Sequence, residues 1–209
     1  MDEPLNRIAM AERITARLRE EKERVKDEFG QPGRVPTFAV DDLLPPAWTQ
    51  AIFAAFPEQG RMRLKNSIRE RKHVAAQMNE HPPILEEAVY AFQHTEVVQL
   101  IAEITGLKAL EPDAELYAGG ISAMGRGAYL KPHLDNSHDA TQDRYRVLNL
   151  LYYVTPDWQP EYGGSLEVWD KGPEGEPRPF PCLFNRLVVM ATNRISWHSV
   201  SEITADARR

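Results

Sequence analysis

Residues 127–136, with the sequence GAYLKPHLDN, place a histidine and an aspartate two positions apart, at His133 and Asp135. Side chains two apart in an extended strand leave the same face, roughly 6.5 Å apart along the backbone. An imidazole and a carboxylate so placed can bind one metal ion with ligand distances of about 2 Å. The best candidate for a third ligand is His198, in the tripeptide WHS. Two histidines and one carboxylate leave open positions on the ion, a geometry suited to oxygen chemistry at non-haem Fe(II).

Each of these ligands also has a simpler interpretation. A His-x-Asp pair occurs often by chance, and a histidine between apolar neighbours, as His198 is, is more often a packed core residue than a ligand. His138 competes for the third position because it closely follows Asp135, although it falls in the loop that leaves the strand. The spacing alone leaves the ligand set open.

The elements that precede this region are predicted to be mainly helical. Apolar residues recur at helical spacing over 4–28 and the pattern ends at Gly30. This helix either packs on the flank of the domain or mediates dimerisation. A Gly/Pro-rich hinge and a strand follow, and then further helices, of which the first has Asp41 and Asp42 as candidate caps. The expected ranges are 30–36 for the hinge, 37–40 for the strand, and 43–56, 82–94 and 95–105 for the helices.

After Pro112 the pattern changes from helical to alternating, with Gly, Pro, Asn and Asp at the turns. Short strands so punctuated favour a double-sheet barrel or sandwich. Helices followed by strands indicate an α+β fold, mainly β, in which the N-terminal helices buttress one sheet. Strands are expected over 115–124, 128–135, 146–154, 164–169, 178–183, 187–192 and 195–200.

The composition excludes several classes of protein. The 209 residues are 42% hydrophobic, enough for the core of one domain, and the net charge of −6 predicts no nucleic-acid or anionic-membrane partner. One cysteine, Cys182, excludes an internal disulfide and fits a reducing compartment. The N-terminus is too charged for a signal peptide, and no apolar run is long enough for a membrane span. We therefore expect a soluble, cytoplasmic monomer or homodimer.

The segment 61–72, RMRLKNSIRERK, is locally basic, with six basic residues and one acidic residue. A solvated face is the simpler interpretation. The alternative is a lid or rim that attracts a substrate carrying a carboxylate or phosphate. On that alternative Arg69 and Arg71 are candidate substrate contacts, and Trp197 is a further candidate for the rim, although core packing also explains a tryptophan.

Five motifs in order resemble the prolyl-4-hydroxylase-like branch of the Fe(II)/2-oxoglutarate-dependent oxygenases. The resemblance covers about residues 115–209, whereas the helical N-terminal half is generic. The motifs are YLKPHLD at 129–135, RVLNLLYY at 146–153, EYGGSL at 161–166, PCLFNRLVVM at 181–190 and SWHSV at 196–200.

The resemblance implies a double-stranded β-helix, also called a jelly roll and cupin-like, with Fe(II) held by His133, Asp135 and His198. It implies no catalytic residue beyond these ligands. The implied domain organisation is an N-terminal amphipathic helix and hinge (1–33) followed by one oxygenase domain (34–209). Within that domain, 34–112 would be helical support and 113–209 the jelly-roll core.

The resemblance also implies a binding site for 2-oxoglutarate. The family uses a basic residue about ten positions beyond the distal histidine to hold the co-substrate, and Arg208 occupies that position, beside Arg209. A guanidinium matches a carboxylate bidentately. Tyr153 would assist it, and Asn149 would reach the C1 end. A frayed, solvated tail and plain core packing are the simpler interpretations. The family carries a further strand here, so the last strand is either truncated or absent.

The implied activity is hydroxylation of an unactivated C–H bond, in a peptidyl residue such as proline or in a small metabolite. Fe(II), O2 and 2-oxoglutarate would be consumed or required, with succinate and CO2 as co-products and ascorbate as a candidate reductant. A non-catalytic jelly-roll module that binds a sugar or peptide is the alternative. Nucleic-acid demethylation is disfavoured by the net charge of −6 and the lack of an extended basic groove.

Overall fold

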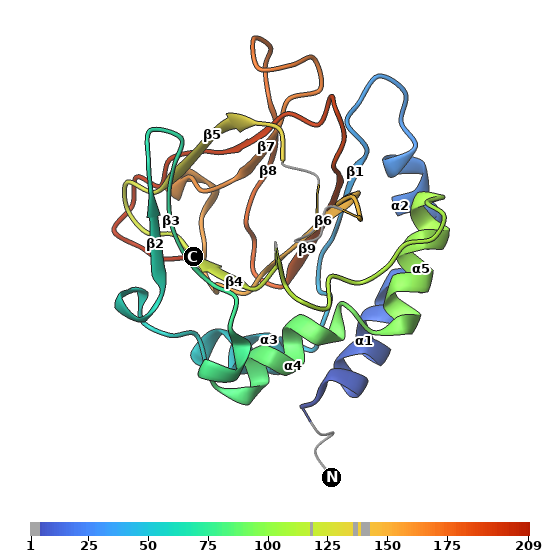
Figure 1. The fold of residues 1–209 in the computed structure, drawn as a ribbon, viewed down its shortest axis with the longest axis horizontal. Coiled ribbons are helices and arrows are strands. Elements are labelled where there is room, and N and C mark those ends of the chain that lie inside the picture. The colour runs from blue at the N-terminus through green and yellow to red at the C-terminus, as the bar shows by residue number, and fades with distance from the viewer. Residues whose placement is uncertain (1–4, 118, 136–137, 139–142) are drawn as a thin grey trace.

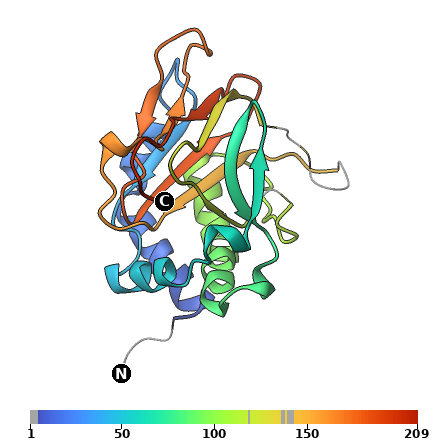
Figure 2. The same cartoon turned by 90° about the vertical axis from the view of Figure 1, so that its left-hand side faces the viewer.

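The computed structural model describes residues 5–117, 119–135, 138 and 143–209. The strands enclose a barrel, and the helices lie along one side of it (Figure 1). The side view shows the helices gathered below the strands (Figure 2). None of the described helices combines the length and apolar character needed to cross a membrane.

The helices lie in the first half of the chain, apart from one short 3-10 turn. They are α1 (Arg7–Glu20), α2 (Lys22–Phe29), α3 (Pro46–Ala54), α4 (Pro83–Ala91) and α5 (Thr95–Thr105), with 3-10 turns η1 (Gln59–Arg61), η2 (Met78–Glu80) and η3 (Pro160–Tyr162). The strands are β1 (Thr37–Val40), β2 (Arg63–Asn66), β3 (Glu70–Ala75), β4 (Ile121–Ala123), β5 (Tyr129–His133), β6 (Leu148–Tyr153), β7 (Leu166–Val168), β8 (Arg178–Phe180), β9 (Arg186–Ala191) and β10 (His198–Val200).

The described strands form two antiparallel sheets. The smaller has the order β1-β9-β6; the larger has the order β2-β3-β5-β10-β7-β8, with β4 paired to β3. The predicted α+β class, mainly β, is confirmed, and so is the double-sheet barrel with helices against one side.

Strands β6 and β9 separate two parts of the core. Successive side chains of a strand point to opposite faces. Leu148 and Tyr152 therefore pack with the helices, while Leu151 and Tyr153 pack in the barrel interior. Strand β9 is apolar on both faces because it is covered on both sides.

The N-terminal helix packs on the domain, as one of its two interpretations predicted. Met10, Ile14 and Leu18 are fully buried, and α1 contacts α4 and α5. The apolar stripe that would mediate dimerisation is thus used within the chain. The single predicted helix over 4–28 is wrong in one respect, because α1 ends at Glu20 and α2 begins at Lys22, where the apolar stripe lapses.

Two other sequence predictions need correction. The helix predicted from residue 43 begins at Pro46 after an N-cap at Pro45, and neither Asp41 nor Asp42 caps it. Asp41 instead pairs with Arg186. The segment 34–112 is not only helical support, because β2 and β3 form a hairpin that extends the larger sheet.

A buried asparagine ties the loop before α3 to the smaller sheet. The Asn185 side chain donates to the carbonyl of Leu44 at 2.7 Å and accepts from its N–H at 3.0 Å. Its oxygen also accepts from the hydroxyls of Thr49 at 3.0 Å and Tyr152 at 2.6 Å. Asn185 is fully buried, and its φ of 62° lies in the left-handed region that asparagine tolerates.

We expect Asn185→Ala to lower the free energy of unfolding by about 3 kcal/mol or more, because each buried partner left unsatisfied costs about 1–3 kcal/mol. Urea denaturation followed by circular dichroism measures the change. Asn66→Ala, the same substitution at an exposed position of β2, should stay within about 0.5 kcal/mol of the unsubstituted protein. Equal effects of the two substitutions would contradict the proposed role of Asn185.

Candidate metal centre

The pairing of two strands brings the predicted ligands together. Strands β5 and β10 are antiparallel neighbours, and His198 lies directly opposite His133. The centroids of the two imidazole rings are 4.2 Å apart. Asp135 follows β5, and its carboxylate oxygens lie 3.6 Å from Nε2 of His133 and 3.5 Å from Nε2 of His198. One ligand atom from each residue lies within 4.8 Å of the others.

Both imidazoles are oriented by the same type of backbone contact. Nδ1 of His133 lies 2.9 Å from the carbonyl oxygen of Lys131, and Nδ1 of His198 lies 3.0 Å from that of Ser196. A carbonyl can only accept, so Nδ1 carries the proton and donates it. Each Nε2 then presents a lone pair toward Asp135, which is the form of histidine that binds a metal.

The carboxylate of Asp135 is held by two residues from the β6 region. Asn149 donates its side-chain N–H to Oδ2, and Nη1 of Arg146 lies 3.3 Å from the same oxygen. Burial alone would raise the pKa of Asp135, but the nearby imidazoles of His133 and His198, together with Asn149 and Arg146, hold it well below its usual value. The carboxyl group is therefore ionised, as a metal ligand must be.

The electrostatics also favour a neutral imidazole at His198. Burial lowers the pKa of His198, and the nearby His133 lowers it further, against the opposing effects of the Ser196 carbonyl and Asp135. The competing ligand His138 instead stacks on Tyr145, with ring centroids 4.9 Å apart. Among the described residues, His133, Asp135 and His198 form the one cluster of three potential metal ligands.

A second polar group lies in the barrel, around Tyr153 and Arg209. The guanidinium carbon of Arg209 lies 5.3 Å from the centroid of the Tyr153 ring. Burial raises the pKa of Tyr153 to about 12, against the opposing charge of Arg209, so the phenol stays protonated at neutral pH. The Tyr153 hydroxyl and Nε of Arg209 are buried and have no hydrogen-bond partner among the described residues. Two unsatisfied donors side by side fit an anion such as a carboxylate.

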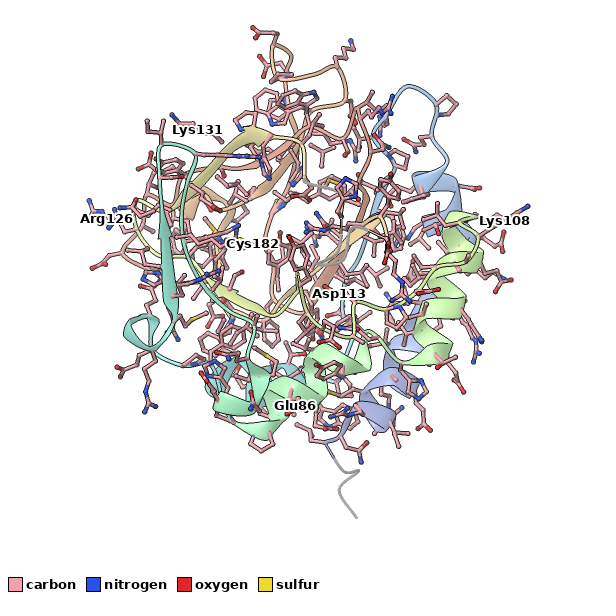
Figure 3. All side chains as sticks on the ribbon, in the orientation of Figure 1. Glu86, Lys108, Asp113, Arg126, Lys131 and Cys182 are labelled. Carbon is pink, nitrogen blue, oxygen red and sulfur yellow. The ribbon has the colours of Figure 1, made fainter. Side chains whose placement is uncertain are left out.

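The space for Arg209 depends on a glycine. Gly164 has a φ of +74°, and a Cβ there would lie 2.8 Å from Nε of Arg209. A cavity of about 1060 Å³ extends past Arg209, Tyr153 and Asn149. Cys182 also lines it and lies inside the ring of strands, whereas Arg126 and Lys131 lie at the periphery (Figure 3).

Comparison with known proteins agrees with this geometry. Residues 119–209 match the family model of the 2OG-Fe(II) oxygenase superfamily. The match contains all three clustered residues, together with Tyr153 and Arg209.

Individual proteins are similar to this chain over part of its length or in fold. Prolyl 3-hydroxylase OGFOD1 from Xenopus laevis is 32% identical over 75 residues, which are 34% of this chain and 14% of that protein. The chain thus matches only a small part of its curated relative. A Pseudomonas putida prolyl-4-hydroxylase structure superposes with a TM-score of 0.63, 16% identity, and coverage of 88% of this chain and 94% of that one. The structure of HygX from Streptomyces hygroscopicus with nickel, 2-oxoglutarate and hygromycin B superposes with a TM-score of 0.52 and 10% identity. The superposition covers 90% of this chain and 83% of that one. The fold is thus the double-stranded β-helix of the prolyl-4-hydroxylase-like proteins.

The structure shows contacts for the residues that were predicted to bind 2-oxoglutarate. Arg208 lines the cavity but donates Nη1 to the carbonyl of Pro57 at 2.9 Å, whereas Arg209 lies beside Tyr153. Asn149, predicted to reach 2-oxoglutarate, binds Asp135. A spacing of about ten residues from His198 fits either of the two adjacent arginines. Their side chains point in opposite directions in an extended chain, so the spacing does not identify which one faces the barrel interior.

Of the three residues predicted to form a substrate rim, Arg69 contacts the segment next to the metal cluster, and Arg71 and Trp197 make other contacts. Arg69 donates Nη2 to the carbonyl of Leu134 at 3.3 Å, next to Asp135. Arg71 is exposed and lies opposite Tyr129 in the sheet, and Trp197 is half-buried, with its carbonyl bound to the N–H of Trp169. Arg146 was not singled out from the sequence, because its contact with Asp135 depends on the packing of two strands.

We expect His198→Ala or Asp135→Ala to weaken binding of Mn(II) at least 100-fold, because each removes a ligand from a cluster of three. Asn149→Ala should weaken it about 10- to 100-fold by releasing Asp135. Titration calorimetry on the apoprotein measures these constants. His138→Ala is the matched control and should change the affinity less than twofold; a comparable loss there would contradict this ligand set.

Proposed function

We propose that the chain is an Fe(II)- and 2-oxoglutarate-dependent dioxygenase that hydroxylates an unactivated C–H bond, in a peptidyl residue such as proline or in a small metabolite. The observation that carries the proposal is the meeting of His133, Asp135 and His198 in a barrel that also holds two buried donors without partners among the described residues. The match of residues 119–209 to the family model of the 2OG-Fe(II) oxygenase superfamily supports it.

The donor set fits the proposed metal. Two neutral imidazole nitrogens and one carboxylate oxygen form the facial set that suits non-haem Fe(II) and leaves positions for other ligands. When bound, iron with O2 and 2-oxoglutarate supplies the oxidising power, and succinate and CO2 are released. The backbone carbonyls of Lys131 and Ser196 fix the two imidazoles, and Asn149 and Arg146 fix the carboxylate.

The second pocket would hold the co-substrate. Arg209 and Tyr153 present a guanidinium and a phenol O–H, both donors, which match the carboxylate of 2-oxoglutarate that lies away from the metal. A protonated phenol can donate where a phenolate could only accept. Val188 and Met190 are fully buried in the same apolar cluster as Tyr153, and an apolar surrounding strengthens the attraction between the guanidinium and a carboxylate.

The proposed location and assembly are those expected from the sequence. The single cysteine, Cys182, is buried and reduced, which supports a cytoplasmic location. We propose a monomer or homodimer with no nucleic-acid partner, and ascorbate as a candidate reductant.

The activity is tested by loading the purified protein with Fe(II) and measuring succinate from 2-oxoglutarate, with and without a panel of proline peptides and small metabolites. We expect slow succinate formation that depends on iron and is stimulated by a substrate. The control is Asp135→Ala, which should form none. Absence of bound iron and of succinate would favour the alternative, a binding module for a sugar or peptide.

We expect Arg209→Ala to raise the dissociation constant for 2-oxoglutarate about 10- to 100-fold, because a hydrogen bond to a charged group contributes about 1.5–3 kcal/mol. Tyr153→Phe should raise it about three- to tenfold. Arg208→Ala is the matched control, with the same change one residue away, and should raise it less than threefold. Titration of the Mn(II)-loaded protein gives the three constants. A larger effect at Arg208 would return the role to the residue that the spacing from His198 favoured.

A further inference from the structure

The charged residues of the β2–β3 hairpin are divided between its two faces. Directly opposite residues of antiparallel strands share a face. Lys65 pairs with Lys72 and Asn66 pairs with Arg71, so the two lysines lie on one face and Arg71 on the other. Glu70 shares the face of Lys72, two residues away.

The lysine face is the one that looks toward the metal cluster. Glu70 lies opposite Leu130 on β5, and Leu130 lies opposite Val200 on β10. Val200 and His198 are two apart on β10 and therefore share that face.

The charges on this inner face are not balanced within the described part of the chain. Nζ of Lys72 lies 3.0 Å from Glu70, and both side chains are mostly buried. Lys65 directly opposes Lys72 and forms no salt bridge in the described residues. Like charges directly opposite each other destabilise a strand pair. Arg63, two residues from Lys65 on β2, lies on the same face. Three cations and one carboxylate thus leave an excess of positive charge that an incoming anion would neutralise.

Two further cations flank the same region. Arg69, in the turn of the hairpin, reaches the carbonyl of Leu134, one residue from Asp135. Arg146 approaches Asp135 from the other side of the barrel. The cationic groups thus gather around the metal cluster in a chain whose net charge is −6.

We propose that the inner face of the hairpin, through Lys65 and Lys72, selects a substrate that carries a carboxylate near the C–H bond to be hydroxylated. This inference rests on the proposed function and adds the chemical class of the substrate. The carboxylate belongs either to an acidic side chain of a peptide or to a free acid. It is distinct from the carboxylate of 2-oxoglutarate, which Arg209 and Tyr153 accommodate.

The test measures binding of two fluorescein-labelled decapeptides, (Glu-Pro)5 and (Gln-Pro)5, by anisotropy. The protein is loaded with Mn(II) and saturated with 2-oxoglutarate, so that the co-substrate site is occupied throughout. We expect the unsubstituted protein to bind the Glu peptide at least tenfold more tightly. Lys65→Glu should reduce this preference below threefold, and Lys65→Gln should give an intermediate value.

Arg71→Glu is the matched control, because it makes the same charge reversal on the outer face of the same hairpin. It should keep the preference within twofold of the unsubstituted protein. An equal loss with Arg71→Glu would show a diffuse charge effect and overturn the proposal. N-acetylaspartate and N-acetylasparagine, tested as competitors, report on a free acid; a preference for N-acetylaspartate alone supports the proposal with a free acid as substrate.

The absence of any preference for a carboxylate, in both the peptide and the competitor measurements, would overturn the proposal. The proposed function is tested separately, by measuring succinate formation by the unsubstituted Fe(II)-loaded protein. Succinate without a charge preference refutes the inference alone. A charge preference without succinate refutes the oxygenase function and leaves an acid-binding site.

Discussion

The site depends on the antiparallel pairing of β5 with β10. Asp135 is close in sequence to His133, but His198 lies 65 positions after His133 and reaches the site only through strand pairing. Cross-strand pairing places their Cβ atoms about 5 Å apart, close enough for both rings to reach one ion. The pairing shifts register between His198 and Val200, so that Leu130 and His133 both face the interior. An uninterrupted ladder would turn one of them outward.

The polar groups of the barrel are arranged so that ligands complete their interactions. An ionised group buried in an apolar interior is costly unless it is paired. Asp135 is already paired by Arg146 and Asn149, so it stays charged without a metal. Tyr153 and Arg209 have no such partners among the described residues, and their unsatisfied donors make the empty pocket less stable than the filled one. The fold therefore satisfies the carboxylate of Asp135 by itself, whereas the donors of Tyr153 and Arg209 are satisfied only when a ligand binds.

What could be predicted from the sequence depends on how local each signal is. The cluster of His133, Asp135 and His198 was found because two ligands lie two residues apart at the end of a strand and the third lies in a motif that resembles a known family. Strand β9 was found because its run of apolar residues is continuous. The hairpin β2–β3 was missed because both of its faces carry charges, which hides the alternation that marks a strand. Arg146 and Arg209 depend on contacts between distant strands, which no spacing records.

The distribution of charge explains how an acidic chain can attract an acidic substrate. At physiological ionic strength the field of a surface charge is screened over about 8 Å, so the net charge of −6 acts weakly on a ligand until it is close to the surface. Within that distance the nearest groups decide, and around the metal cluster these include Lys65, Lys72 and Arg69. Partly buried charges are screened less than exposed ones, and the side chain of Lys72 is only 23% exposed. A partly buried cation near the metal cluster can therefore attract an anion more strongly than many distant carboxylates repel it, because the cation is closer to the anion and its charge is less screened.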